Sequence, residues 1–459
     1  MIVLATDPAD PAHIARQLGR RPMPCWLVSP GAGEIEATRE FLASDPVVVV
    51  RGESLSDLQQ AWQQARRAWA AGDAGHPVGI GFLSYDLGRP FMRLRSTPPP
   101  PSGWPGLEFR FYDALWVHER GAGGHAPSAQ IWATDLRAAT ALRERVSHAP
   151  PRDGTSAGFT LTPLRSAQSP AHHLRAVRRV LEYLRAGDVY QVNLARQLLA
   201  HATSQGPIGL ELFARLRAET PAPHALWLAD PAAGRALVGN SPERFLRLDP
   251  HGVIETAPIK GTRARPASRP TPEDPEGDPG AAGAEDLAAA LTELAASPKD
   301  RAEHVMIVDL ERNDLGRICA VGSVEVVAPL RGLALPSVLH LVSTVRGRLP
   351  RDPDIGLPEI LRATFPGGSI TGAPKRRAME IIDELEPVQR GPYTGATGWL
   401  GAAGDFDLAV AIRTATLVGE TLSLWVGGGI VADSVPEAEL AETEVKARAF
   451  AAQALREVV

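Results

Sequence analysis

Lysine is scarce in this sequence, and one lysine is placed where its amine could act as a nucleophile. Only four of the 48 basic residues are lysines, namely Lys260, Lys299, Lys375 and Lys446. A buried lysine can lose its proton, whereas an arginine cannot. Lys260 follows the apolar stretch 254–259 and precedes Gly261. This order predicts that Lys260 lies at the end of an apolar strand, before a turn. Shielding from water would activate such an amine. The alternative is that an arginine-rich composition left these lysines by chance.

Two pairs of carboxylates are spaced three residues apart in segments whose pattern predicts helices. Asp300 and Glu303 form one pair, and Glu439 and Glu442 form the other. Residues three apart share one face of a helix. Four carboxylates without a cysteine or histidine cluster are typical of a site for Mg²⁺, which prefers oxygen ligands and keeps several waters. Each pair alone is also typical of a solvated helix face, and the spacing does not show whether the two helices meet.

Two further features indicate a site for an anion. Arg413 lies inside the apolar stretch 409–417, and a guanidinium in a buried strand requires an anionic partner in the protein or in a ligand. The glycine-rich segment 367–375 is not a phosphate-binding P-loop, because Ala373 and Pro374 separate its second glycine from the lysine. We expect Pro374 at the first position of a helix whose backbone N–H groups could hold a carboxylate. An ordinary helix start explains the segment equally well.

The composition limits the class of protein in which such a site could lie. The chain has 459 residues, enough for two or three units of about 150 residues or for one large fold. A net charge of −5, with both signs spread along the chain, argues against a nucleic-acid partner. No stretch reaches the roughly 20 apolar residues of a membrane span, and the N-terminus does not resemble a signal peptide. Cys25 and Cys319 are too few for a disulfide framework or a cysteine metal site. We therefore expect a soluble, cytoplasmic protein.

The elements that would position these residues follow from the pattern of apolar residues and breakers. Residues 148–170, rich in proline, glycine and serine, are the predicted linker between a strand-rich region, 1–147, and a longer region, 171–459. The polar stretch 264–286 is either a surface insertion or a flexible cover over the site of Lys260. Consecutive strands near the C-terminus favour antiparallel pairing over repeated βαβ units. Helices are expected at 55–72, 170–186, 299–316, 357–365, 374–386 and 437–458, and strands at 46–50, 78–88, 107–119, 189–200, 323–333, 340–349, 395–402, 406–418 and 422–432.

Eight segments between residues 170 and 459 resemble, in the same order, signatures of the chorismate-utilising enzymes. A match of eight ordered signatures does not arise by chance, whereas the N-terminal third matches more loosely. The segments are SPERF (241–245), PIKGTR (258–263), AEHVMIVDLERNDLGR (302–317), HLVS (340–343), FPGGSITGAPKRRAMEII (365–382), GPYTGATGW (391–399), AIRTA (411–415) and GGGIVADSVPEAELAETEVKA (427–447).

The resemblance implies an α+β fold and a set of site residues. In this fold, two large antiparallel β-sheets pack in a sandwich with helices outside, and both halves of the chain contribute. A Mg²⁺ ion anchors the ring carboxylate of chorismate, with Glu303 and Glu442 as ligands and Asp300 and Glu439 beside them. The other matching positions are Arg413 and Tyr393 for the enolpyruvyl carboxylate, Gly429, Ser369 and Lys446 along the substrate carboxylates, Gln191 and Thr262 as further substrate contacts, His340 as the active-site histidine, and Glu243 as the carboxyl that handles the departing ring hydroxyl.

Two positions distinguish branches of this family. The isochorismate and salicylate synthases use a lysine in a strand that here reads QVNLAR, with Gln191 in its place. A neutral amide cannot act as a general base for water, so the resemblance implies a branch that uses ammonia. Within that branch, PIKGT resembles the aminodeoxychorismate synthases, whose lysine adds covalently to the ring, and Lys260 matches the position of that lysine. Chorismate and ammonia would then give 4-amino-4-deoxychorismate, a precursor of para-aminobenzoate and folate.

The sequence leaves two alternative functions open and does not account for the source of ammonia. The nearest alternative is an anthranilate synthase component I, in which a small residue replaces Lys260 and pyruvate is also eliminated; the other is a non-catalytic sensor of chorismate or tryptophan. Neither Cys25 nor Cys319 lies on a glycine-flanked turn typical of a glutaminase nucleophile. We therefore expect a separate glutamine amidotransferase subunit to supply ammonia. Whether tryptophan binds near residues 26–30 is left open.

Overall fold

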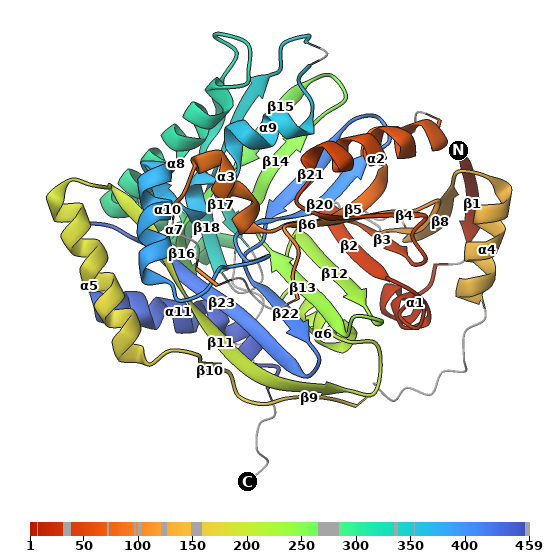
Figure 1. The fold of residues 1–459 in the computed structure, drawn as a ribbon, viewed down its shortest axis with the longest axis horizontal. Helices are drawn as coiled ribbons and strands as arrows, with labels where there is room; N and C mark the ends of the chain where they lie inside the picture. The colour runs from red at the N-terminus through yellow and green to blue at the C-terminus, as the bar shows by residue number, and fades with distance from the viewer. Residues whose placement is uncertain are drawn as a thin grey trace.

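Two large β-sheets pack face to face at the centre of the molecule, and helices lie outside them (Figure 1). The structure, a computed structural model, describes residues 1–6, 8–30, 38–70, 73–95, 98–99, 103–120, 126–147, 158–264, 284–334, 338–352 and 354–454. The strand pairs in these ranges are antiparallel. The α+β sandwich expected from the sequence is confirmed.

The first sheet contains 13 of the strands that the described residues form. In spatial order they are β1 (Ile2–Thr6), β8 (Ser128–Ala133), β7 (Ala114–Glu119), β3 (Thr38–Ala43), β2 (Cys25–Pro30), β12 (His224–Asp230), β13 (Arg235–Ser241), β22 (Thr414–Val418), β23 (Thr421–Ile430), β11 (Gln191–Ser204) and β10 (Arg165–Ser166), while β9 (Phe159–Leu161) and β19 (Gly372–Ala373) also pair with β11.

The second sheet contains ten strands within the same described ranges. In spatial order they are β16 (Ile259–Ala264), β18 (Val338–Arg348), β15 (Val253–Ala257), β14 (Arg244–Leu248), β21 (Phe406–Val410), β20 (Ala396–Gly401), β5 (Pro77–Leu83), β6 (Leu107–Phe111) and β4 (Val48–Gly52), while β17 (Glu325–Ala334) pairs with β18.

Both sheets combine strands from the two ends of the chain. In the first sheet β2 pairs with β12, and in the second β5 pairs with β20. The N-terminal region 1–147 therefore shares hydrogen-bonded sheets with the region 171–459. The division of the chain at 148–170 stays a prediction about the sequence, and residues 148–157 of that linker lie outside the described residues.

The six predicted helices all begin within one residue of the predicted start, but the last ends at Ala451 rather than at 458, and five other α-helices in the described residues were not predicted. For example, α5 follows the cap residue Ser169, whose hydroxyl accepts the N–H of His172, and it ends at Gly187, whose φ is 82°. One helix starts inside the stretch 264–286 that we expected to be a loop; residues 265–283 of that stretch lie outside the described ones. The α-helices are α1 (Pro11–Leu18), α2 (Leu55–Ala68), α3 (Arg89–Met92), α4 (Leu136–Ser147), α5 (Pro170–Ala186), α6 (Leu210–Glu219), α7 (Ala284–Ala296), α8 (Pro298–Gly316), α9 (Leu357–Thr364), α10 (Lys375–Leu385) and α11 (Pro436–Ala451).

The core has layers because alternate residues of a strand point to opposite faces of its sheet. On β2, Trp26 and Val28 pack in the apolar cluster between the first sheet and its helices. Their neighbours Cys25 and Leu27 pack instead in the cluster between the sheets, which includes Phe82 of the second sheet. All six residues of β2 are consequently buried, which explains why apolar and polar residues do not alternate along it.

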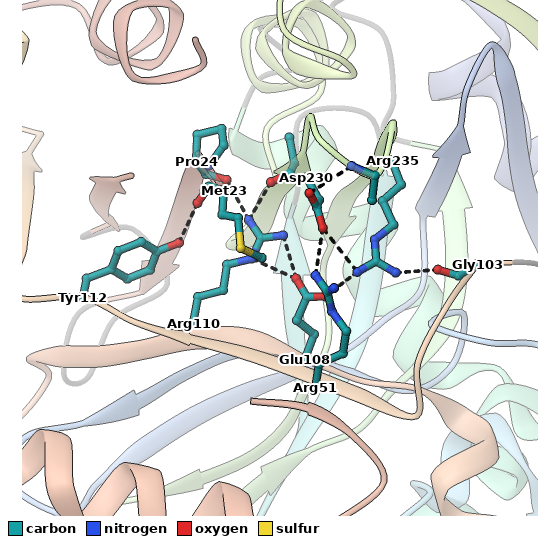
Figure 2. Close-up of polar contacts among 11 residues, drawn as sticks. Met23, Pro24, Arg51, Gly103, Glu108, Arg110, Tyr112, Asp230 and Arg235 are labelled. Atoms are coloured by element: carbon teal, nitrogen blue, oxygen red, sulfur yellow. Dashed lines mark hydrogen bonds and ion pairs between the residues drawn. The ribbon is translucent and has the colours of Figure 1, made fainter. Parts of the chain in front are cut away.

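A network of ion pairs, buried except for the exposed Arg51, also joins the two sheets (Figure 2). Glu108 of β6 accepts hydrogen bonds from Arg51 at 2.8 Å, from Arg110 at 2.7 Å and, across the sandwich, from Arg235 of β13 at 2.7 Å. Arg51 also donates to Asp230 of the first sheet at 2.8 Å. Three guanidinium groups thus share two carboxylates, so that the buried charges are paired, as burial requires.

A membrane-spanning helix is not among these elements. Of the helices in the described residues, none combines the length and the apolar character needed to cross a bilayer.

Candidate active site

The residues predicted for the site converge on one cavity of about 590 Å³, a volume typical of a small-molecule site. The walls come from β11, β16, β18, β23, α8 and α11, together with the loops around Glu243, Ser369, Tyr393 and Arg413. Eleven of the predicted residues line it: Glu243, Lys260, Glu303, His340, Ser369, Tyr393, Arg413, Gly429, Glu439, Glu442 and Lys446.

Lys260 presents its amine to the cavity from a distorted part of β16. The register of β16 against β18 shifts between Lys260 and Thr262, and the intervening Gly261 has a φ of +64°, a left-handed conformation that favours glycine. The prediction that Lys260 ends an apolar strand was wrong: β15 ends at Ala257, and Lys260 is the second residue of the next strand. A bulge, rather than a strand end, turns this side chain into the cavity.

The charge state of Lys260 reflects opposing influences. Burial lowers its pKa, and the positive charge of Lys446 acts in the same direction. The carboxylates of Glu303, Glu243 and Glu442 oppose this shift, yet the net pKa is below the ordinary value of lysine. A lower pKa increases the fraction of neutral amine, which is the nucleophilic form.

Gln191 and Gly429 define the space that this amine occupies. The amine of Lys260 lies 3.5 Å from the side-chain oxygen of Gln191, at the start of β11. A Cβ atom on Gly429 would lie 3.0 Å from both the amine of Lys260 and the amide carbon of Gln191. The absence of a side chain at Gly429 therefore leaves room for both groups. Gln191 contacts the amine of Lys260 but is not among the residues that line the cavity.

Glu243 is a buried carboxyl that also lines the cavity. It lies between β13 and β14, and only 5% of its surface is exposed. The hydroxyl of Ser369 donates a hydrogen bond of 2.6 Å to its Oε1. Burial raises the pKa of Glu243 to about 7, although the Ser369 hydrogen bond and the charge of Lys260 lower it. A carboxyl with this pKa is protonated often enough near neutrality to act as a general acid.

His340 of β18 connects the lysine turn to the buried arginine. Its Nδ1 lies 3.2 Å from the carbonyl oxygen of Gly261, and its Nε2 lies 3.3 Å from Nη2 of Arg413. Because a carbonyl only accepts hydrogen bonds, Nδ1 must carry the proton and Nε2 must accept from Arg413. Burial and the charge of Arg413 lower the pKa of His340 to about 4. The imidazole is therefore neutral in this arrangement.

The sequence predicted Arg413 inside a strand, but the structure places it between two strands. The apolar stretch splits into β21 of the second sheet and β22 of the first, and Arg413 lies where the chain crosses between them. Its φ is +49°, an uncommon conformation for a residue other than glycine. The crossover turns the guanidinium into the cavity instead of leaving it within a sheet. A strained residue at a cavity wall is typical of a functional site.

Carboxylates of α8 and α11 also line the cavity. A Cβ atom on Gly428 would lie 3.3 Å from an oxygen of Glu439 and 3.6 Å from an oxygen of Glu442, so these two carboxylates converge over this glycine. Glu303, from α8, lines the same cavity. The described residues contain no group of three or more ligands close enough to hold a metal ion by themselves. Two converging carboxylates nevertheless suit Mg²⁺, which commonly takes one or two carboxylates and fills its shell with water and substrate oxygens.

The remaining predicted residues are placed as follows. Lys446 forms an ion pair of 2.7 Å with Glu442 and donates to the carbonyl of Gly427 at 2.7 Å. Tyr393 stacks on Trp425, with ring centroids 6.0 Å apart. The backbone of Thr262 pairs with that of His340 in the β16–β18 ladder. The side chains of Thr262 and Asp300 lie outside the described ones.

The start of α10, where the sequence offered an anion site, is not part of this cavity, and that site stays a prediction. The helix begins at Lys375, with Pro374 before it, and the cavity walls in the described residues do not include this turn. Lys375 instead binds Asp314 and the carbonyl of Thr364 in the interior. Within the same motif it is Ser369 that reaches the cavity.

Sequence reasoning also missed residues of the site. Asn193 and Trp425 line the cavity, and Glu311 lies directly behind it. The alternation along β11 offered a signal for Asn193, because Gln191 and Asn193 share a face of the strand. Nothing in the pattern distinguished Trp425 from an ordinary core residue.

Comparisons with known proteins agree with this geometry. The chorismate binding enzyme family matches residues 24–452. The chain is 41% identical over 367 residues to aminodeoxychorismate synthase component 1 of Escherichia coli, covering 79% of this chain and 74% of that protein. It is 38% identical over 396 residues to anthranilate synthase component 1 of Streptomyces coelicolor, covering 82% and 72%.

Solved structures show the same arrangement of sheets and helices. The crystal structure of anthranilate synthase component I from Streptococcus pneumoniae is 27% identical, with a TM-score of 0.74, and the match covers 92% of this chain and 94% of that one. The fold is also that of the menaquinone-specific isochorismate synthase of Escherichia coli, which has a TM-score of 0.72 at 19% identity and a match covering 98% and 93%. The cavity, the matched length and the shared fold lead to one conclusion: the chain belongs to the family of chorismate binding enzymes.

Proposed function

We propose that the chain is an amine-transferring enzyme that converts chorismate and ammonia into 4-amino-4-deoxychorismate, which leads to para-aminobenzoate and folate. The observation that carries the proposal is the amine of Lys260, which lines the cavity, is half-buried, has a lowered pKa and lies close enough to Glu243 for their charges to interact. A residue at this position that can form a covalent bond is what the anthranilate branch lacks. The relative from Escherichia coli named aminodeoxychorismate synthase component 1 supports this choice.

The chemistry assigns separate tasks to Lys260 and Glu243. The neutral amine of Lys260 forms a bond to ring carbon 2, the ring double bonds shift, and the bond between carbon 4 and its hydroxyl breaks. Glu243, with a pKa of about 7, gives its proton to that hydroxyl, which leaves as water. Ammonia then forms a bond to carbon 4, the double bonds shift back, and the bond between carbon 2 and Lys260 breaks. Lys260 is thereby regenerated, and the ammonia nitrogen gives its extra proton to the carboxylate of Glu243, which restores the acid for the next cycle.

Positioning falls to the charged groups of the cavity walls. Arg413 and Lys446 would bind the two carboxylates of chorismate, while Tyr393 and Gly429 shape the wall beside them. Glu439 and Glu442, together with Glu303 from α8, would hold Mg²⁺. Such an ion would supply positive charge to neutralise and orient a substrate carboxylate. Ordering the substrate in this way converts the encounter with Lys260 into an intramolecular step.

Ammonia would come from a separate glutamine amidotransferase subunit. A glutaminase needs a reactive cysteine thiolate, whereas burial raises the pKa of both Cys25 and Cys319 to about 11. Neither cysteine lines the cavity. The name "component 1" of the similar proteins from Escherichia coli and Streptomyces coelicolor fits a protein that works with a second subunit.

The second candidate function is that of an anthranilate synthase component, favoured by the 38% identity to the Streptomyces coelicolor protein. Product analysis with chorismate, Mg²⁺ and ammonium salts at alkaline pH separates the two. We expect 4-amino-4-deoxychorismate and no pyruvate. Release of pyruvate together with a fluorescent aromatic product would establish the anthranilate reaction instead. Absence of any turnover would favour a sensor of chorismate.

A further inference from the structure

Glu311 is a buried carboxyl that the proposed chemistry does not use. It lies on α8, and 3% of its surface is exposed. Its side chain is not among the cavity walls. Its Oε1 accepts the backbone N–H of Gly368 at 3.0 Å, so the carboxyl holds the loop that follows α9. A carboxyl is an expensive group to bury for that purpose alone, because its desolvation opposes folding.

The loop that Glu311 holds carries the hydrogen bond to Glu243. Gly368 and Ser369 belong to one short 3₁₀ turn (Gly368–Ile370). A Cβ atom on Gly368 would lie 2.5 Å from Leu310 and 3.2 Å from Oε1 of Glu311, so the turn packs directly on α8. The next residue, Ser369, donates its hydroxyl to Glu243 at 2.6 Å. One peptide unit therefore separates the contact made by Glu311 from the contact made by Glu243.

The charges around Glu311 keep it close to neutral. Burial raises its pKa to about 8, and the neighbouring carboxylates of Asp314 and Glu243 add to this shift. Lys375 lowers the pKa of Glu311, but its ammonium is hydrogen-bonded to Asp314 and to the carbonyl of Thr364. A neutral Glu311 supplies an acceptor for Gly368 without placing a full negative charge behind Glu243.

We propose that Glu311 is a positioning residue for Glu243, acting through the Gly368–Ser369 turn. By fixing the turn against α8, Glu311 keeps the Ser369 hydroxyl on Oε1 of Glu243 and so holds the acid toward the reacting hydroxyl. The inference rests on the proposed function, because it needs Glu243 to be the acid. Loss of the Glu311 contact would release Ser369, and Glu243 would lose a hydrogen bond that stabilises its ionised form. Its pKa would then rise, against the charges of Lys260 and Lys446, which stay in place.

The test compares variants of Glu311 in the intact chain. Glu311→Leu removes the acceptor, whereas Glu311→Gln keeps an oxygen for the Gly368 N–H. Asp309→Asn, an exposed change on the same helix, is the matched control. Chorismate consumption with ammonium measures turnover whatever the product. We expect Glu311→Leu to lower kcat about 10-fold with little change in KM, and Glu311→Gln to restore most of that loss. Equal kcat in Glu311→Leu and Asp309→Asn would overturn the proposal.

A double-mutant cycle shows whether Glu311 acts through Ser369. In Ser369→Ala and in Glu311→Leu, the pH at which activity falls because Glu243 ionises should move upward by a similar amount. The double variant should show no further shift, since both changes remove the same hydrogen bond. Independent, additive shifts would contradict the proposed route.

Two further variants keep the outcome interpretable. Should Glu311→Leu fail to fold, Gly368→Ala separates the turn from α8 with Glu311 intact, and the same upward shift is expected. Glu243→Gln tests the underlying function separately. If Glu243→Gln retains activity, the assignment of Glu243 as the acid is wrong. If Glu243→Gln is inactive but Gly368→Ala and Glu311→Leu are as active as the control Asp309→Asn, only the role of Glu311 is wrong.

Discussion

The guanidinium of Arg413 donates to Nε2 of His340 at 3.3 Å, while Nδ1 of the same imidazole donates to the carbonyl of Gly261. These two contacts place His340 between the group expected to bind a substrate carboxylate and the turn that carries Lys260. With a pKa lowered to about 4, His340 serves both neighbours as a neutral donor and acceptor. The nucleophile and the anion-binding arginine are thereby held in a fixed relation, although Arg413 lies at a crossover between sheets.

Replacement of His340 should therefore affect both substrate binding and turnover. In His340→Ala we expect kcat/KM to fall about 100-fold, because Arg413 and the Lys260 turn both lose a partner that fixes their geometry. His340→Gln should retain more activity, since an amide offers one N–H and one oxygen. The exposed His201 provides the control His201→Ala. Steady-state kinetics that do not distinguish His340→Ala from this control would contradict the arrangement.

Glu243 should control both the pH dependence of activity and that of stability. Its proton must be present for catalysis, so the rate per free ammonia should fall as pH rises through about 7. Because the folded-state pKa lies above that of an unfolded glutamate, Glu243 binds more protons in the folded state, and its contribution to stability decreases as pH rises from about 4.5 to about 7. Glu243→Gln should be inactive, yet its melting temperature should exceed that of the wild type more at pH 8 than at pH 5. An equal difference at both pH values would contradict the raised pKa.

These relationships show what the sequence could predict. The caps of α5, the antiparallel sheets and most residues of the cavity follow from local patterns and ordered motifs, because each depends on neighbours in the chain or on a matching signature. The position of Arg413 could not be predicted, since an unbroken apolar stretch does not reveal that one residue adopts a φ of +49° and passes the chain to another sheet. The role of Gly368 beside Glu311 was equally hidden, because the two residues are 57 positions apart.

Removal of a metal ligand should lower activity more than stability. We expect Glu303→Gln and Glu442→Gln to lose most turnover, since each removes one charge from the expected Mg²⁺ site. Glu437→Gln, an exposed change at the start of α11, is the control. EDTA should abolish the activity of the wild type, and added Mg²⁺ should restore it. Full turnover in EDTA would rule out a role for the ion.

The three consecutive glycines of β23 should respond differently to alanine. A Cβ atom on Gly427 would lie 2.6 Å from the backbone oxygen of Leu194, so Gly427→Ala should mainly destabilise the fold. On Gly428 the Cβ atom would approach Glu439, so Gly428→Ala should mainly raise the Mg²⁺ concentration needed for half-maximal activity. On Gly429 it would press on the amine of Lys260, so Gly429→Ala should mainly lower kcat. Thermal unfolding, Mg²⁺ titration and turnover measured for all three variants check this order, and identical effects would contradict it.

Lys260 offers the sharpest test, because the proposal assigns it a covalent bond. Burial lowers its pKa, whereas the guanidinium of Lys260→Arg would stay protonated and could not attack the ring. Lys260→Arg should therefore be nearly inactive despite its conserved charge. Lys260→Ala should lose much of the rate but not all of it, because ammonia could still attack carbon 4 directly while Glu243 and the carboxylates of α11 stay in place.

The covalent bond itself can be detected in the wild type. Incubation with chorismate and Mg²⁺ without ammonia should leave an adduct on the peptide that contains Lys260, detectable by mass spectrometry after quenching and digestion. The other lysines of the chain serve as internal controls. An adduct on Lys446 instead, or wild-type turnover in Lys260→Arg, would remove the reason for preferring amination at carbon 4 over the anthranilate reaction.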